Sequence, residues 1–180
     1  MADVPILRTP RLSLRAHRLE DFAVMAAMWA DPETFRFIGA GQPLGEDAVW
    51  ARLQRVAGSW PILGYGFWAI EHAVSGRVIG EAGFLERRAP EGDRREPEAG
   101  WAVETAARGR GFAGEAVAAI LAWGDARFAR TSCVIASVNT PSIALARRRG
   151  YRERGPVDPP ADWTGPELIG FERERPVPAR

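Results

Sequence analysis

A glycine-rich turn, Arg108-Gly109-Arg110-Gly111-Phe112-Ala113-Gly114, separates two segments of different character. Residues 100–103 before it are typical of a strand, and residues 115–128 after it carry apolar side chains at helical spacing. Glycine lets the backbone adopt a positive φ and approach a partner closely. A helix that begins at such a turn points unpaired N–H groups outward, which suits an anion such as phosphate. The turn therefore predicts a strand-turn-helix unit with a phosphate site at its centre.

The segments before this turn predict antiparallel strands. Residues 65–71 and 77–86 are strand-like runs joined by a short turn at 73–76, which indicates a hairpin. Residues 87–98 are almost wholly charged or turn-forming and read as an exposed connection to a third strand at 99–104. A dinucleotide-binding fold instead places its glycine loop directly after the first strand of a parallel sheet. The position of the turn therefore argues against a nucleotide-binding oxidoreductase.

The N-terminal third predicts one strand and two helices. Residues 11–15 alternate polar and apolar side chains, as a half-buried strand does. Residues 22–29 have apolar side chains at i, i+3, i+4 and i+7, the spacing of a helix with one apolar face, before Asp31-Pro32 interrupts it. A second helix is indicated over residues 49–56. We expect these helices and the glycine-rich loop between them to form one wall of a cleft.

The segments after the turn complete an α/β pattern. Residues 132–138 are apolar on both faces, which is typical of a central strand. A threonine followed by proline begins a predicted helix over residues 140–150, and a glycine ends it. Strands are expected at 151–154 and 168–173, around a proline-rich loop. The whole order predicts a single-domain α/β fold whose mixed, mainly antiparallel twisted sheet has about seven strands, with helices on both faces.

Composition limits the classes of partner. A chain of 180 residues suits one domain, and its formal net charge of +1 provides no strong field toward nucleic acid or a membrane surface. Cys133 is the only cysteine, so no disulfide can form within the chain, and it reads as a small buried core residue. No run of about 18 apolar residues occurs. We expect a cytoplasmic protein without nucleic-acid, membrane or metal partners, either a monomer or a homodimer.

The spacing within the turn resembles a known cofactor loop. Arg108, Gly111 and Ala113 match the pattern Gln/Arg-x-x-Gly-x-Gly/Ala, the pyrophosphate loop of the GNAT superfamily of acyl-CoA-dependent N-acetyltransferases. Three further segments resemble the RimJ/RimL-like branch, whose members acetylate the N-termini of ribosomal proteins. They are Leu7 to Arg15, Val78 to Gly83, and Asn139-Thr140-Pro141-Ser142 with the later pair Gly150-Tyr151.

The resemblance extends over nearly the whole chain and includes a strand at Glu98 to Trp101. It implies a GNAT fold for residues 7–175, with tails at 1–6 and 176–180, and acetyl-CoA as the cosubstrate. It also implies that the cofactor lies between the strands at 100–103 and 132–138. The residues that it assigns to cofactor binding are Trp101, Val103, Arg108, Gly109, Arg110, Gly111, Phe112, Ala113, Gly114, Asn139 and Ser142.

The implied reaction is direct transfer of an acetyl group from a thioester sulfur to an amine. An amine of pKa about 10 is mostly protonated at neutral pH, so a base is useful. Glu81 is the first candidate because family members often place a base on that strand, and Glu98 is the second. Many members carry a tyrosine that protonates the leaving thiolate, but this chain has Ala146 there. The thiolate is then expected to take its proton from Ser142 or from water, or to leave without one.

Several alternatives stay open at the level of sequence. The acceptor is the amine of a protein N-terminus or of a small molecule, and a non-catalytic acyl-CoA sensor is the alternative function. Trp60 and Trp163 fall in predicted loops and are candidates for lining an acceptor pocket. His17 and His72 lie in segments that read as loop or strand end, so we expect them at the surface.

Overall fold

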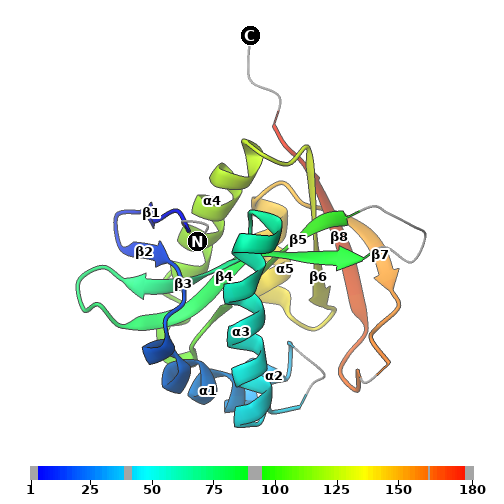
Figure 1. Ribbon diagram of the computed structural model, residues 1–180. Helices are drawn as coiled ribbons and strands as arrows, with labels where there is room; N and C mark the ends of the chain where they lie inside the picture. Colours follow the sequence, from blue (N-terminus) through cyan, green and yellow to red (C-terminus); the bar gives the residue numbers. More distant parts are fainter. Residues whose placement is uncertain (1–3, 39–41, 89–94, 162, 177–180) are drawn as a thin grey trace.

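The computed structural model describes residues 4–38, 42–88, 95–161 and 163–176. Eight strands form one sheet in the order β1-β2-β3-β4-β5-β6-β8-β7 (Figure 1). Every neighbouring pair is antiparallel except β5 with β6, which is parallel. The strands are β1 (Leu7–Arg8), β2 (Leu12–Arg15), β3 (Phe67–His72), β4 (Val78–Arg88), β5 (Arg95–Val103), β6 (Arg130–Ala136), β7 (Arg152–Val157) and β8 (Leu168–Glu174).

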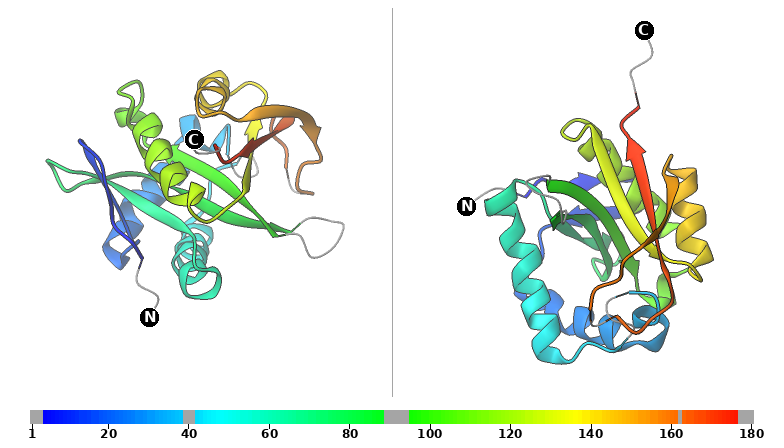
Figure 2. Two further views of the ribbon diagram at one scale, coloured as in Figure 1. Left: turned by 90° about the horizontal axis from the view of Figure 1, so that it is seen from above. Right: turned by 90° about the vertical axis from the view of Figure 1, so that its right-hand side faces the viewer.

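Helices cover both faces of the sheet, as the sequence predicts. The long helix α3 and helix α1 lie on one side of the strands, and α4 and α5 lie on the other (Figure 2). Two short 3-10 helices, η1 and η2, precede α1 and follow β5. The bounds are η1 (Leu19–Asp21), α1 (Phe22–Ala30), α2 (Pro32–Phe35), α3 (Glu46–Leu63), η2 (Thr105–Ala107), α4 (Phe112–Asp125) and α5 (Thr140–Arg148).

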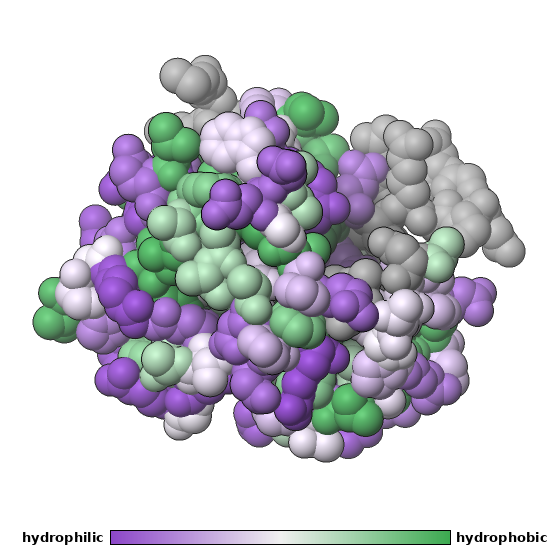
Figure 3. Space-filling view, turned by 90° about the horizontal axis from the view of Figure 1, so that it is seen from below, coloured by the Kyte–Doolittle hydropathy of each residue, from purple (hydrophilic) through white to green (hydrophobic). Residues whose placement is uncertain are grey.

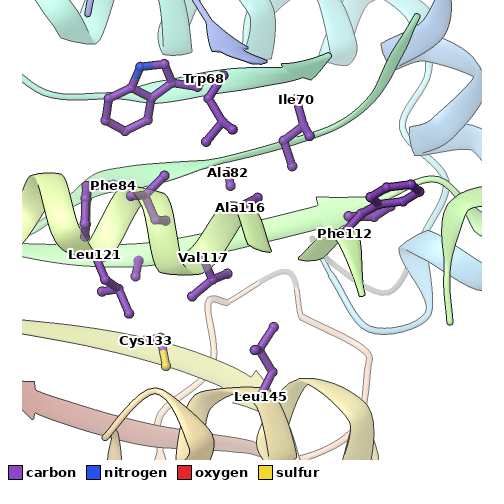
Figure 4. Packing of buried hydrophobic residues seen from close by; sticks show 14 of the residues in the cluster. Trp68, Ile70, Ala82, Phe84, Phe112, Ala116, Val117, Leu121, Cys133 and Leu145 are labelled. Atoms are coloured by element: carbon purple, nitrogen blue, oxygen red, sulfur yellow. The ribbon is translucent and has the colours of Figure 1, made fainter. Parts of the chain in front are cut away.

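The two layers bury separate cores because side chains along a strand alternate between faces. On β4, Ala82 and Phe84 face α4, where Val117 and Leu121 pack against the sheet (Figure 4). On β5, Ala102 belongs instead to the core between the sheet and helices α1 and α3. Glu81, one residue from Ala82 and paired with Ala102, therefore lies on the α1 and α3 side.

Some elements differ from the sequence expectation. Trp60 lies inside α3 and not in a loop, and its buried indole donates a hydrogen bond to the carbonyl of Phe67. The exposed connection expected over residues 87–98 is shorter, because β4 continues to Arg88 and β5 begins at Arg95. The sheet has eight strands because the two-residue β1 joins its edge, which is compatible with the expectation of about seven.

Strands β5 and β6 separate from each other in the middle of the sheet. Their parallel pairing consists of one register pair, Glu98 with Ser132, after which β5 continues to Val103 and β6 to Ala136 without pairing. Side chains of α4 and α5, among them Val117 and Leu145, pack near this region (Figure 4). The divergence leaves backbone groups of a central strand without a neighbouring strand.

Candidate active site

The end of β5 presents backbone groups to the opening between β5 and β6. Glu104 N–H donates to the carbonyl of Ile79, so the pair Gly80 and Val103 is of the type that exchanges no hydrogen bonds. The N–H and carbonyl of Val103 therefore point away from β4 and toward the side of β6. The Val103 carbonyl is already bonded to Arg108, which leaves its N–H as the group available to a ligand.

The turn before α4 has a backbone geometry suited to an anion. Gly109 and Gly111 have φ of 74° and 81°, a region that favours glycine. Within the described part of the chain, no backbone N–H from Gly109 to Gly114 donates a hydrogen bond. Six consecutive donors at the positive end of a 14-residue helix are a donor set suited to the oxygens of a phosphate or pyrophosphate.

Three arginines surround this loop. The guanidinium carbons of Arg11 and Arg110 lie 4.7 Å and 5.0 Å from the centroid of the Phe112 ring. Arg149, at the end of α5, donates a 2.6 Å hydrogen bond to the carbonyl of Gly114. Their positive charges favour an anion at the loop. Arg11 was not foreseen from the sequence, since it is distant along the chain and part of no motif for this site.

Arg11 is held in place by a carboxylate at the start of α4. Its Nε lies 2.6 Å from Oε2 of Glu115, and the hydroxyl of Thr9 donates to Oε1 of the same group at 2.6 Å. Burial raises the pKa of Glu115, but the hydrogen bonds from Thr9 and Arg11 outweigh it and hold that pKa below its usual value. The N-terminal strand is thereby fixed beside the loop.

Arg108 was expected to bind the cofactor, and its side chain connects protein segments. Its guanidinium donates to the carbonyls of Val103 at 3.0 Å and Glu33 at 2.9 Å, and to the hydroxyl of Thr34 at 2.7 Å. The hydroxyl of Thr105, three residues before Arg108, also bonds to Asp31 at the start of α2. The loop is thus tied both to the strand end and to helix α2.

The residues expected on the other side of the opening lie at the start of α5. Asn139 accepts a 3.2 Å hydrogen bond from the backbone N–H of Ser142, so its side-chain oxygen caps the helix. Ser142 is half-buried in the first turn of α5, beyond the end of β6. Both residues therefore flank the opening between the strands. The side-chain nitrogen of Asn139 takes no part in this cap and can donate to a ligand in the opening.

Glu81 is fully buried and ion-paired. Its Oε1 accepts bonds from Nε of Arg52 on α3 at 2.9 Å and from a terminal nitrogen of the same guanidinium. The other oxygen, Oε2, lies 3.7 Å from Nε2 of His17. The surface position expected for His17 is wrong, because its side chain is only 1% exposed. No pattern in the sequence links His17 or Arg52 to Glu81.

Glu98 lies far from Val103 at the end of β5. It sits at the point where β5 and β6 still pair, opposite Ser132. Five residues of extended strand, about 16 Å, separate it from Val103. Its charge is felt at Cys133, since burial and Glu98 together raise the pKa of that thiol. The structure therefore does not bring Glu98 together with the end of β5.

The two tyrosines of the chain lie elsewhere in the fold. Ala146, at the position of the family tyrosine, is fully buried in α5. Tyr151 bonds to Thr131 at 2.8 Å, and its burial raises the pKa of its phenol despite that bond. Tyr65 lines a 450 Å³ pocket with Phe128, and this phenylalanine belongs to the segment that follows the C-terminal end of α4. The described part of α5 therefore offers no phenol at the position of Ala146.

The tryptophans expected to line an acceptor pocket differ in their positions. Trp60 packs edge to face against Trp68 and Trp123 in the core, so its assignment to a loop was wrong. Trp163 does lie in the loop between β7 and β8, where it borders a 390 Å³ pocket and donates to the carbonyl of Pro166 at 2.8 Å. Gln42, which precedes α3, contacts the neighbouring Thr164 at 3.5 Å.

The surface formed by α1, α2 and the start of α3 is chemically mixed. Seen from below, green apolar residues extend across the middle of this face between purple hydrophilic ones (Figure 3). Helix α2 belongs to this end of the molecule and is the helix that Arg108 contacts.

In the described ranges, no helix is both long and apolar enough to cross a membrane.

Taken together, the geometry fits a long ligand with a charged and a neutral part. The loop before α4 offers donors for a pyrophosphate, and the opening between β5 and β6 offers backbone groups to an amide-containing arm. The N–H of Val103 can donate to an oxygen that gains negative charge during acyl transfer. Acetyl-coenzyme A has these parts in this order.

Comparisons with known proteins agree with this geometry. A family model described as "Acetyltransferase (GNAT) domain" matches residues 11–152. A putative GNAT-family acetyltransferase from Bordetella pertussis is 36% identical, with a TM-score of 0.79 over 94% of this chain and 99% of that one. An acetyltransferase from Agrobacterium tumefaciens is 26% identical, with a TM-score of 0.77 over 96% and 95%.

A more distant structure shares the fold. It is a RimL ribosomal L7/L12 alpha-N-protein acetyltransferase in complex with coenzyme A. It is 14% identical, with a TM-score of 0.76, and the match covers 94% of this chain and 98% of that one.

Proposed function

Because this chain belongs to the GNAT acetyltransferase family and is an N-acetyltransferase, we propose that it moves an acetyl group directly to a primary amine. The family uses acetyl-CoA as the donor. The proposed acceptor is the N-terminal amine of a protein or the amine of a small molecule. The observation that carries the proposal is the run of six N–H groups, from Gly109 to Gly114, that donate to nothing in the described part of the chain and lie beside two diverging strands.

The donor side follows from these groups. Backbone N–H groups from Gly109 to Gly114 would hold the pyrophosphate, with Arg11, Arg110 and Arg149 adding positive charge. The pantetheine arm would lie between β5 and β6, near Trp101 and the side chain of Asn139. When bound, acetyl-CoA supplies an activated acetyl group as a thioester.

The chain itself provides orientation and electrostatic stabilisation. Holding the amine against the thioester contributes up to about 7–11 kcal/mol when the two groups are well aligned. The N–H of Val103 donates to the carbonyl oxygen as the amine attacks, and one such donor contributes about 3–4 kcal/mol in other acyl-transfer enzymes. Ser142 or water returns a proton to the sulfur, since Ala146 has no acidic group.

Within the family, we place this chain in the RimJ/RimL-like branch as part of the proposal. Leu7 to Arg15, Val78 to Gly83 and the segment from Asn139 to Tyr151 resemble the RimJ/RimL-like branch. We therefore favour a protein N-terminus over a small amine as the first class of acceptor to test. The two classes differ in size, and a peptide needs an open channel beside the thioester.

The test is thiol release from acetyl-CoA with a panel of N-terminal peptides and small amines. Cys133 is 1% exposed, so it adds little background to a thiol reagent. All 24 basic residues of the chain are arginines, so acetylation of its own lysines cannot compete. Release with at least one acceptor supports the proposal. Tight acetyl-CoA binding without release against the whole panel would favour the sensor alternative.

A further inference from the structure

His17 lies between β2 and η1 and has no hydrogen-bond partner among the described residues. Both ring nitrogens are buried, and neither finds a donor or acceptor within the residues that the structure describes. Leaving a buried polar group unsatisfied costs about 1–3 kcal/mol, so such groups in native proteins usually have a water partner or a catalytic role. The two nitrogens of His17 are thus not engaged by the described part of the chain and can bond to water or to a ligand.

The nearest polar atom is the free oxygen of Glu81. Arg52 bonds to Oε1 of that carboxylate, and Oε2 is buried, has no hydrogen-bond partner in the described ranges and lies 3.7 Å from Nε2 of His17. This separation is too long for a hydrogen bond. Contacts of this kind in ligand-free catalytic sites often shorten when substrate binds. A movement of less than about 1 Å would join the two groups.

The charges around the imidazole nearly cancel. Glu81 on β4 and Asp21 on η1 are the carboxylates that face it, and Arg52 on α3 and Arg15 on β2 are the guanidiniums. Arg15 and Asp21 form a closed pair at 2.8 Å. Burial lowers the pKa of His17, while Glu81 opposes that shift. The ring is thus neutral at neutral pH and has a free lone pair, as a proton acceptor requires.

This cluster lies beside the proposed reaction site. Glu81 pairs with Ala102, the residue before Val103, and lies on the face of the sheet covered by α1 and α3. The guanidinium of Arg52 is fixed there by the indole of Trp29, whose centroid is 4.3 Å away. The site residues of the donor side, in contrast, gather at the N-terminal ends of α4 and α5. The acceptor amine would arrive from the face that holds His17.

We propose that His17 accepts, through water, the proton that the acceptor ammonium must lose, and that Glu81 positions the imidazole and stabilises its protonated form. The inference rests on the proposed acetyl transfer and assigns its base. It transfers to His17 the role first expected for Glu81, whose carboxylate is already held by Arg52. Because the ring nitrogens are buried, the acceptor amine does not touch them directly, and a water between the two carries the proton.

The acceptor ammonium loses two protons during the transfer. The ammonium group gives one proton through water to His17, which becomes an imidazolium beside Glu81. The neutral amine then forms a C–N bond to the acetyl carbon as the C–S bond breaks. The second proton of the amine passes through Ser142 or water to the departing sulfur, and His17 returns its proton to solvent after the amide has left.

The experiment compares His17→Ala and His17→Gln with the wild type over pH 5 to 9. We expect kcat to fall by a factor on the order of 100 and the acidic limb of the profile to disappear. Affinity for coenzyme A, measured by calorimetry, should stay at the wild-type value. Added imidazole should restore part of the rate of His17→Ala, because a free base can occupy the vacated space. A wild-type pH profile in either variant, or a rate loss that imidazole does not restore, would overturn the inference.

The second histidine supplies a matched control. The chain has two histidines, and His72 contacts Ser75 at 3.1 Å in the hairpin turn. His72→Gln should keep the acidic limb and leaves one imidazole to follow by NMR. The pKa of that imidazole must coincide with the kinetic pKa, and the additional change Glu81→Gln must lower it further. A mismatch refutes the role of His17 even if the alanine variant fails to fold.

Different results would refute acetyl transfer and refute His17 as its base. Absence of thiol release by the wild type with every acceptor refutes acetyl transfer. Turnover by the wild type together with unchanged pH dependence in folded His17→Ala refutes only the assignment of the base.

Discussion

Replacement of Gly111 by valine tests the donor half of the site. Gly111 precedes α4 with φ of 81°, and a built Cβ would lie 3.4 Å from the guanidinium of Arg11. A left-handed conformation costs an ordinary residue about 1–2 kcal/mol, and a β-branched residue is the least tolerant. The variant must therefore either bear this strain or relax the turn to a negative φ.

Relaxation would turn neighbouring N–H groups away from the ligand. A hydrogen bond to a charged group contributes about 1.5–3 kcal/mol. Loss of two such bonds, for example those of Gly111 and Phe112, costs about 3–6 kcal/mol, or roughly a 10²- to 10⁴-fold weaker affinity for coenzyme A. Calorimetric titration with coenzyme A measures this change directly.

A control separates strain from loss of the site. Gly64, at the end of α3, has φ of 75°, and a Cβ built there meets nothing within 4 Å. Gly64→Val should lose a similar stability, with Tm falling by about 2–4 °C per kcal/mol, and keep its affinity for coenzyme A. If Gly111→Val is folded and binds coenzyme A within about threefold of the wild type, the loop does not hold the pyrophosphate.

Three further predictions concern the surroundings of the site. Arg108→Gln should lower the free energy of unfolding by about 1–3 kcal/mol in a urea titration, because three side-chain hydrogen bonds are lost. If Arg108→Lys is as stable as the wild type, the positive charge alone matters and the hydrogen bond to Val103 is not needed. Since the folded-state pKa of His17 is lowered, stability should decline as pH falls below about 6.5, and this slope should be missing in His17→Gln. The pKa of Glu115 is also lowered, so its contribution is present above about pH 4.5 and lost in acid; Glu115→Gln should flatten that part of the stability curve, and an unaltered curve would contradict the ion pair.

The sequence predicted the elements whose local signals agree with their tertiary setting. Helices α1, α4 and α5 and the hairpin of β3 and β4 were expected close to their observed bounds, because apolar spacing, capping residues and turn residues coincide there. Trp60 was misplaced because the Pro61 after it reads as a helix breaker, although α3 continues to Leu63. Tertiary packing of Trp60 against Trp68 accompanies that continuation.

The candidate site was predictable where it is built from backbone, and much less so where it depends on side-chain partners. The glycine turn could be predicted because positive φ demands glycine at Gly109 and Gly111. The partners of Glu81 could not, since Arg52 and His17 come from separate elements and meet only in the folded protein. Arg108 matched a cofactor motif, yet its side chain is engaged by carbonyls of the chain itself.

The single register pair between β5 and β6 makes the central sheet two units joined at one end. Strands β1 to β5 form one unit and β6 to β8 the other, with Glu98 and Ser132 at their shared corner. A ligand seated between them would take the place of the missing ladder and link the two units beyond this corner. The free energy of binding would then add to the free energy needed to separate β5 from β6. Amide exchange in β6 should therefore slow on addition of coenzyme A, more than exchange in the fully paired β3.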